Sequence, residues 1–165
     1  MPTSGIPKRK PGRTPELALT VQYGQSSARL PSRASFRLWV RAALGRSDGR
    51  RRAVRLTVRI VGVREARLLN RHYRGRDYAT NVLTFIYSKQ SPLEGDIAIC
   101  APVVAREAHL RGVRREARYA HLTVHGVLHL QGFDHGRAAD AQRMEKREAR
   151  ILRRLGYADP YQIAE

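Results

Sequence analysis

Four stretches of the chain carry the apolar spacing that is typical of β-strands. Large apolar side chains occupy every second position of 17–23 and of 54–60, with arginine and threonine between them in the second stretch. Two further stretches, 81–87 and 95–100, are rich in β-branched and aromatic residues, and a loop containing Pro92 separates them. We therefore predict four strands, the last two of which can pair as a hairpin-like unit.

Five other segments have the spacing or the end signals of helices. Ser32 and Pro102 are residue types that begin helices, and Gly45 and Gly112 are residue types that end them. The predicted helices cover about 33–44, 63–73, 102–111, 114–131 and 138–155. The order of elements predicts an α/β (α+β) fold, a single domain with a mixed sheet of about four strands packed with about five helices. The helix 114–131 is apolar on most sides, so we expect it to be central.

Length and composition bound the organisation of the chain. A chain of 165 residues suits one domain with a real core. Residues 1–15 hold four prolines and four basic residues, so we expect a disordered basic extension there and a single domain over 16–165. No apolar run is long enough to cross a membrane. The single cysteine, Cys100, excludes an intramolecular disulfide and suits a reducing compartment. We expect it to be a buried side chain that only packs in the core.

The formal net charge is extreme. The chain has 32 basic and 14 acidic residues, which gives +18. Such a surface attracts polyanions by steering and by counterion release. Arginine richness can equally reflect genome composition, so the charge supports a nucleic-acid partner without identifying one.

Histidines are concentrated in one stretch, 121–135, which holds four of the six in the chain. His125 and His129 are four residues apart, so on a helix they stand about 6 Å apart along the axis on nearly the same side. His121 lies about 12 Å from His129 on the same helix and cannot complete a shared site. Gly132 can end the helix, and the chain can then double back to deliver His135. Three imidazoles without a thiolate favour one zinc ion per chain with an open fourth position, which indicates catalysis.

The histidine spacing also occurs in zincin metalloproteases, where a glutamate follows the first histidine. Here that position is Gly126, so the general base of a peptidase is missing. Two nearby residues have open roles. His121 can shuttle a proton, contact substrate or make a satisfied polar contact, and Asp134 can orient an imidazole or cap the turn.

A second polar cluster lies between a predicted helix and the third strand. Arg71, Arg74, Arg76 and Asp77 occupy this turn. A guanidinium held there can contact a phosphate in bidentate fashion and stabilise charge that develops on it. The alternative is an ordinary solvated basic loop, which this stretch alone favours.

Four motifs together resemble the YbeY family of ribosomal-RNA maturation factors. They are LNRHYRGRDYATNVLTF (69–85), EGDIAIC (94–100), HGVLHLQGFDH (125–135) and LGYADPY (155–161). The resemblance implies a zinc-dependent, single-strand-specific endoribonuclease that acts in the cytoplasm in ribosomal RNA processing, at the 3′ end of 16S rRNA, and in ribosome quality control. Its partners would be ribosomal RNA and the small ribosomal subunit, with no membrane and no organic cofactor.

The resemblance also assigns residues. It implies that His125, His129 and His135 bind zinc, that His125, His129 and Arg74 are catalytic, and that Arg74 contacts substrate. Zinc can activate water at neutral pH and polarise a phosphoryl oxygen. The residues leave open whether water or the RNA 2′-hydroxyl attacks. Two other functions remain alternatives: an RNA-binding ribosome-assembly factor with a structural zinc, and a zincin-like metallopeptidase, which Gly126 disfavours.

Overall fold

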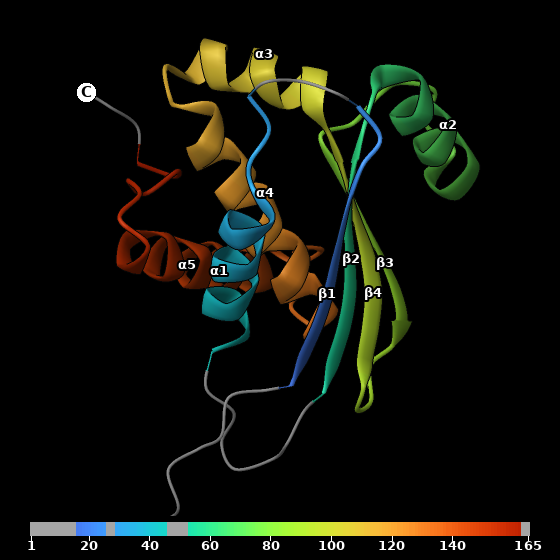
Figure 1. The fold of residues 1–165 in the computed structure, drawn as a ribbon. Coiled ribbons are helices and arrows are strands. Elements are labelled where there is room, and N and C mark those ends of the chain that lie inside the picture. The colour runs from blue at the N-terminus through green and yellow to red at the C-terminus, as the bar shows by residue number, and fades with distance from the viewer. Residues whose placement is uncertain (1–15, 26–28, 46–52, 163–165) are drawn as a thin grey trace, which may run out of the picture.

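A computed structural model describes residues 16–25, 29–45 and 53–162, and these form one α/β domain (Figure 1). The four strands and five helices follow the predicted order. They are β1 (Leu17–Tyr23), α1 (Arg33–Leu44), β2 (Val54–Val61), α2 (Val63–Arg74), β3 (Val82–Ser88), β4 (Leu93–Cys100), α3 (Ala101–Arg111), α4 (Arg115–Leu130) and α5 (Ala138–Arg154). The predicted disordered extension, residues 1–15, lies outside the described residues.

The sheet is mixed, with strand order β1-β2-β4-β3. β1 pairs with β2 and β2 with β4 in parallel, whereas β3 pairs with β4 in antiparallel fashion. The predicted pairing of the last two strands is thereby confirmed. β3 is one edge of the described sheet, and a register irregularity lies between Ile86 and Ser88.

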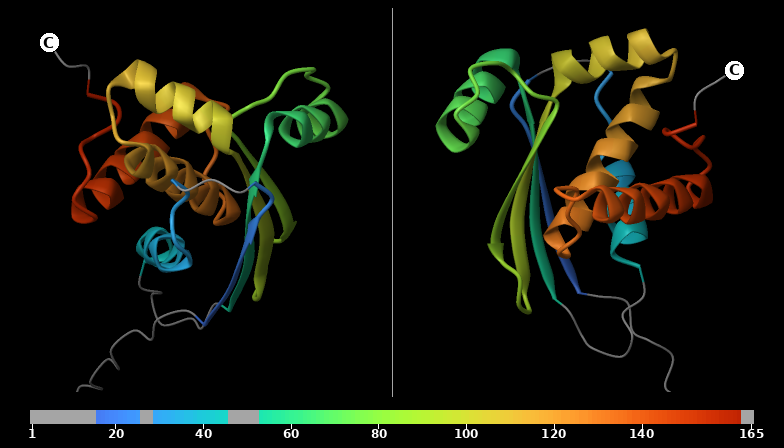
Figure 2. Two further views of the ribbon diagram at one scale, coloured as in Figure 1. Left: turned by 45° about the horizontal axis from the view of Figure 1, so that its top comes forward. Right: turned by 180° about the vertical axis from the view of Figure 1, so that it is seen from behind.

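The alternating pattern explains which face of the sheet is covered. The apolar positions of β2, such as Val58 and Ile60, are fully buried, while Arg55 and Arg59 point to the other face and pair with Glu94 and Glu65. Helices α1, α4 and α5 lie on the apolar side of the sheet, and α2 lies on the opposite side (Figures 1 and 2). One face therefore forms the core and the other is mostly polar.

The helix predicted to be central, α4, is the core of the domain. Eleven of its sixteen residues are buried, and it contacts α1, α3, α5, β3 and β4. It ends beyond Leu130, and Gly132 then takes a positive φ of 96° that suits glycine. Along the described residues, no helix is long and apolar enough to cross a membrane.

Candidate metal centre

Three histidines converge at the C-terminal end of α4. His125 and His129 project from successive turns, and the turn through Gly132 brings His135 back to them. One nitrogen atom of each imidazole lies within 4.8 Å of the other two, and the Nε2 atoms of His125 and His129 are 3.1 Å apart. This spacing suits one metal ion. The convergence predicted from the spacing of the histidines is what the structure shows.

The cluster opens into a pocket of about 350 Å³ between α4 and the edge strand β3. His125 and His129 are half-buried and His135 is exposed. The other side chains that line the pocket come from α2, β3 and the turn between them: Arg74, Thr80, Asn81, Val82, Leu83, Thr84 and Ile86. The histidines are therefore accessible to a substrate.

A buried carboxylate, Glu148 of α5, fixes the orientation of His125. Glu148 is fully buried, and its Oε1 lies 2.6 Å from Nδ1 of His125. Its Oε2 lies 2.9 Å from Nε2 of His121 and also accepts a hydrogen bond from the Tyr161 hydroxyl. Arg118 can only donate to Nδ1 of His121, at 2.9 Å, so the proton of a neutral His121 must be on Nε2 and point at Glu148. In the same way, a proton on Nδ1 of His125 leaves its Nε2 lone pair facing His129.

The pKa shifts agree with this assignment. Burial would raise the pKa of Glu148, but hydrogen bonds from His121 and His125 outweigh it and bring the pKa to about 2. Burial lowers the pKa of His121 despite its contact with Glu148. Burial, with the neighbouring His125 and His135, lowers the pKa of His129 to about 4. At neutral pH, Glu148 is thus ionised while His121 and His129 are neutral, and a neutral imidazole is the form that binds a metal.

The hydrogen bonds continue from Arg118 to the opposite wall of the pocket. Arg118 Nη2 donates to Glu107 at 2.9 Å, and Asn81 Nδ2 donates to the same carboxylate at 3.0 Å. Asn81 also accepts from the backbone N–H of Val82 at 2.7 Å, so its amide is fixed. We call the connected side chains the polar ring, since both ends line the same pocket. Its members are Asn81, Glu107, Arg118, His121, Glu148 and His125.

The glycine that replaces the peptidase glutamate has a packing role. Gly126 is buried against the sheet, and a Cβ atom there would lie 2.8 Å from Cδ1 of Ile97 and 3.1 Å from Oγ1 of Thr84. A glutamate side chain at this position would have to displace the side chains of Ile97 and Thr84. The sequence predicts only that the carboxylate is missing; the structure shows that the space for it is missing too.

The arginine cluster is divided by the structure. Arg74, in the last turn of α2, lines the histidine pocket, whereas Arg71 and Arg76 are exposed and are not among its lining residues. Asp77 is held by Arg67 of α2, with a shortest contact of 2.7 Å. The predicted contact between Arg74 and a phosphate therefore has a suitable place, and the other members of the cluster belong to the surface.

Asp134 and His121, whose roles the sequence leaves open, both make structural hydrogen bonds. Asp134 Oδ1 accepts from the backbone N–H groups of His135 and Gly136, at 2.7 and 3.2 Å, so it caps the turn, and these bonds lower the pKa of its carboxyl. His121 is buried and uses both ring nitrogen atoms in the polar ring. Glu148 is a site residue that was not predicted from the sequence. Its signal was a lone carboxylate on the apolar face of α5, one helical turn from Met144 and from Leu152.

The protein is a single α/β domain in which two histidines of the central helix and one of the turn after it form an accessible cluster that could hold a metal ion. Comparison with known proteins names the family. The family model of endoribonuclease YbeY matches residues 21–156. The chain is 48% identical over 163 residues to the endoribonuclease YbeY of Nitrosomonas europaea, covering 99% of this chain and 96% of that protein. It is 54% identical to the one of Thiobacillus denitrificans, covering 89% and 97%.

The chain belongs to the endoribonuclease YbeY family, and its enzyme class follows from that membership. The resemblance predicted from the four motifs is confirmed. A solution structure of a Thermotoga maritima protein shares the fold, with a TM-score of 0.51 and 21% identity over 88% of this chain and all of that one.

Proposed function

We propose that this chain is a zinc-dependent, single-strand-specific endoribonuclease of ribosomal RNA. Its tasks would be the maturation of the 3′ end of 16S rRNA and ribosome quality control, in the cytoplasm, with the small ribosomal subunit as partner. The observation that carries the proposal is the meeting, in one open pocket, of three imidazole nitrogens and the guanidinium-bearing Arg74. Membership of an endoribonuclease family supports RNA as the substrate.

The residues present fit a zinc ion. His125, His129 and His135 offer three nitrogen ligands without a thiolate, the donor set of zinc sites that keep a position open. Glu148 holds the Nδ1 side of His125, so that its Nε2 points into the cluster. When bound, zinc would supply Lewis acidity toward water and toward a phosphoryl oxygen at neutral pH.

The side chains of the pocket have distinct tasks in this proposal. Arg74 binds a non-bridging phosphate oxygen and stabilises the negative charge that grows there during cleavage. Asn81 keeps the wall that carries Arg74 and β3 in register with α4, because its amide is fixed through Glu107 and Arg118. A single strand can turn a phosphate inward to a pocket of about 350 Å³ more easily than a stiff duplex can.

The test uses purified wild-type protein and three variants on single-stranded ribosomal RNA. His129→Ala removes a ligand, Arg74→Glu removes the phosphate contact, and Arg71→Glu is the matched control one turn earlier on α2. We expect cleavage by the wild type and by Arg71→Glu, and a loss of about 100-fold or more in the other two. Metal analysis should find about one zinc per chain.

Two outcomes would contradict the proposal. Equal cleavage by all four proteins would show that the activity comes from elsewhere than this pocket. RNA binding without cleavage by the zinc-loaded wild type would favour a ribosome-assembly factor in which the zinc is structural.

A further inference from the structure

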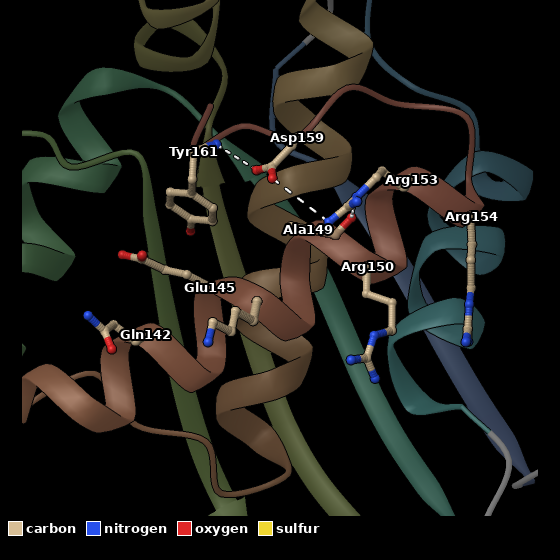
Figure 3. A pocket seen from close by; sticks show the side chains of 9 residues that line it. Gln142, Glu145, Ala149, Arg150, Arg153, Arg154, Asp159 and Tyr161 are labelled. Carbon is tan, nitrogen blue, oxygen red and sulfur yellow. Dashed lines mark hydrogen bonds and ion pairs between the residues drawn. The ribbon is translucent and has the colours of Figure 1, made fainter. Parts of the chain in front are cut away.

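We propose that a second site, a groove on the outer side of α5, binds single-stranded RNA through its phosphates and through one stacked base. The proposal rests on the endoribonuclease class and goes beyond the histidine pocket. The groove has a volume of about 720 Å³ and lies between α5 and the segment 157–162 that follows it (Figure 3). Its basic side chains are Lys146, Arg150, Arg153 and Arg154.

Three of these cations form a row. Lys146, Arg150 and Arg154 are spaced by four residues along α5, so they stand about 6 Å apart along the helix axis on one side. All three are exposed, and none has a hydrogen-bond or ion-pair partner among the residues that the structure describes. Unpaired cations at this interval suit successive phosphates of one extended strand, each of which they can neutralise.

The carboxylates of the groove do not cancel this row. Asp159 is already used, because it accepts from the backbone N–H of Tyr161 at 2.9 Å and lies 4.0 Å from Arg153 (Figure 3). Glu145 lies at the end of the groove near Gln142 and Tyr161, away from Arg150 and Arg154 (Figure 3). The end of the groove that carries Arg150 and Arg154 is therefore left with a net positive charge.

Tyr161 gives the groove a fixed aromatic ring. Its hydroxyl is held by Glu148 and lies 3.1 Å from Nε2 of His121, and its ring packs against the His121 ring in a T-shaped arrangement with centroids 5.4 Å apart. The residue is still 39% exposed and lines the groove. A ring whose hydroxyl end is fixed and whose side is open can stack a base with little loss of side-chain entropy.

A row of unpaired cations beside an aromatic platform is the combination that binds single strands without reading their sequence. Lys146 and Arg150 project from the side of α5 opposite Glu148, at about 100° per residue, so the groove and the histidine pocket flank the same helix. Glu148 contacts both Tyr161 and His125, and thus sits between the two sites. The groove can hold a segment of the strand beyond the phosphate that is cleaved.

The first experiment measures binding without cleavage. Fluorescence anisotropy with labelled oligouridine in EDTA compares wild type, Lys146→Glu/Arg150→Glu/Arg154→Glu and a control triple variant. The control, Arg37→Glu/Arg106→Glu/Arg111→Glu, changes three exposed arginines of α1 and α3 and lowers the net charge by the same amount. We expect the groove variant to bind at least about tenfold more weakly, and its salt slope to fall by about 2, the value for three phosphates on a single strand.

The second experiment separates the ring of Tyr161 from its hydroxyl. Tyr161→Phe keeps the stacking surface, and Tyr161→Leu removes it. We expect oligouridine binding to be retained in the first variant and to fall roughly tenfold in the second. Circular dichroism and thermal melting of each variant confirm that it is folded.

Several results would overturn the proposal. An equal loss of affinity and of salt slope in both triple variants would mean that net charge alone drives binding. Unchanged affinity in the groove variant would exclude RNA from the groove. If polyglutamate binds the wild type and loses affinity in the groove variant while oligouridine does not, the groove takes an acidic polypeptide instead. Cleavage assays are separate, so failure of the histidine pocket as a nuclease site would not be confused with these outcomes.

Discussion

At the scale of single residues, the least replaceable side chain outside the histidine cluster is Glu148. It is fully buried, it is ionised, and it satisfies His121, His125 and Tyr161 together. A buried charge with this many partners is tolerated because three hydrogen bonds, spread over both carboxylate oxygens, stabilise it. Its contribution to the site is the fixed orientation of His125, one of the three proposed metal ligands.

Glu148→Gln should weaken zinc binding by about 10- to 100-fold, because the neutral amide holds the Nδ1 proton of His125 less firmly. Competition with a chromogenic chelator measures the affinity. The matched control is Glu94→Gln, which removes a carboxylate that pairs with the exposed Arg55. Equal affinity in wild type and Glu148→Gln would show that the carboxylate supports only the fold.

Acid should destabilise the metal-free protein in two stages. The pKa values of His121 and His129 are lowered from 6.5 and that of Glu148 from 4.5 to about 2, so the unfolded chain binds protons that the folded chain does not. Stability is therefore full above about pH 6.5 and falls as the pH decreases, first through the histidines and then, below pH 4.5, through Glu148. Between its pKa in the folded state and its pKa in the unfolded state, each group changes the free energy of unfolding by about 1.4 kcal/mol per pH unit.

Urea unfolding in EDTA over a pH series measures this dependence. Removing the carboxylate in Glu148→Gln should weaken the second stage, to which Asp134 and Asp77 also contribute, and should keep the contribution of His129 to the first stage. A free energy of unfolding that stays constant between pH 6.5 and pH 4.5 would contradict the assignment of neutral, buried histidines.

At the scale of elements, the contact between α4 and the sheet decides which side chain fits at position 126. Gly126 lets the helix approach Ile97 of β4 and Thr84 of β3 closely, which brings the histidines against the edge strand. Gly126→Ala should change stability little, because a gain in helix propensity of about 1 kcal/mol offsets a tight contact with the mobile end of Ile97. Gly126→Glu should lose about 3 kcal/mol or more through overpacking and a buried charge.

Denaturant unfolding of the zinc-bound proteins tests the pair of substitutions. Casein cleavage by Gly126→Glu would contradict the inference that a peptidase base has no room here. A glutamate variant as stable as the alanine variant would show that the sheet yields at this point.

The elements themselves were predictable because their signals are local. The alternation of 54–60, the cap at Ser32 and the glycine after each helix are read within a few residues, and the histidine triad lies within eleven. Glu148 was not predicted because its partners are 13 to 27 residues away in the chain and most of its neighbours in residues 145–150 are charged. The insertion of β4 between β2 and β3 is also non-local, since no short pattern specifies which strands pair.

At the scale of the whole molecule, a metal at the cluster would join α4 to the turn that carries His135. Binding to the folded state alone raises stability by about 2.7 kcal/mol when free zinc is 100 times the dissociation constant. Treatment with EDTA should therefore lower the melting temperature, and zinc should restore it. In His135→Ala the difference between the two conditions should shrink markedly, which differential scanning fluorimetry can measure. His109→Ala, an exposed histidine of α3, is the control and should respond like the wild type.

The polar ring has a consequence for how substitutions combine. Asn81 and Glu148 lie 67 positions apart and share no contact, yet Glu107, Arg118 and His121 connect them in one chain of hydrogen bonds. Effects on distant sites normally add. Here the shared hydrogen bonds should make the two effects on zinc affinity non-additive. Once Glu148→Gln has weakened the hydrogen bonds at one end, Asn81→Ala should reduce the zinc affinity by less than it does in the wild type. The coupling energy of this pair, obtained from the zinc affinities of the two single variants and the double variant, should differ from zero by about 0.5 kcal/mol or more.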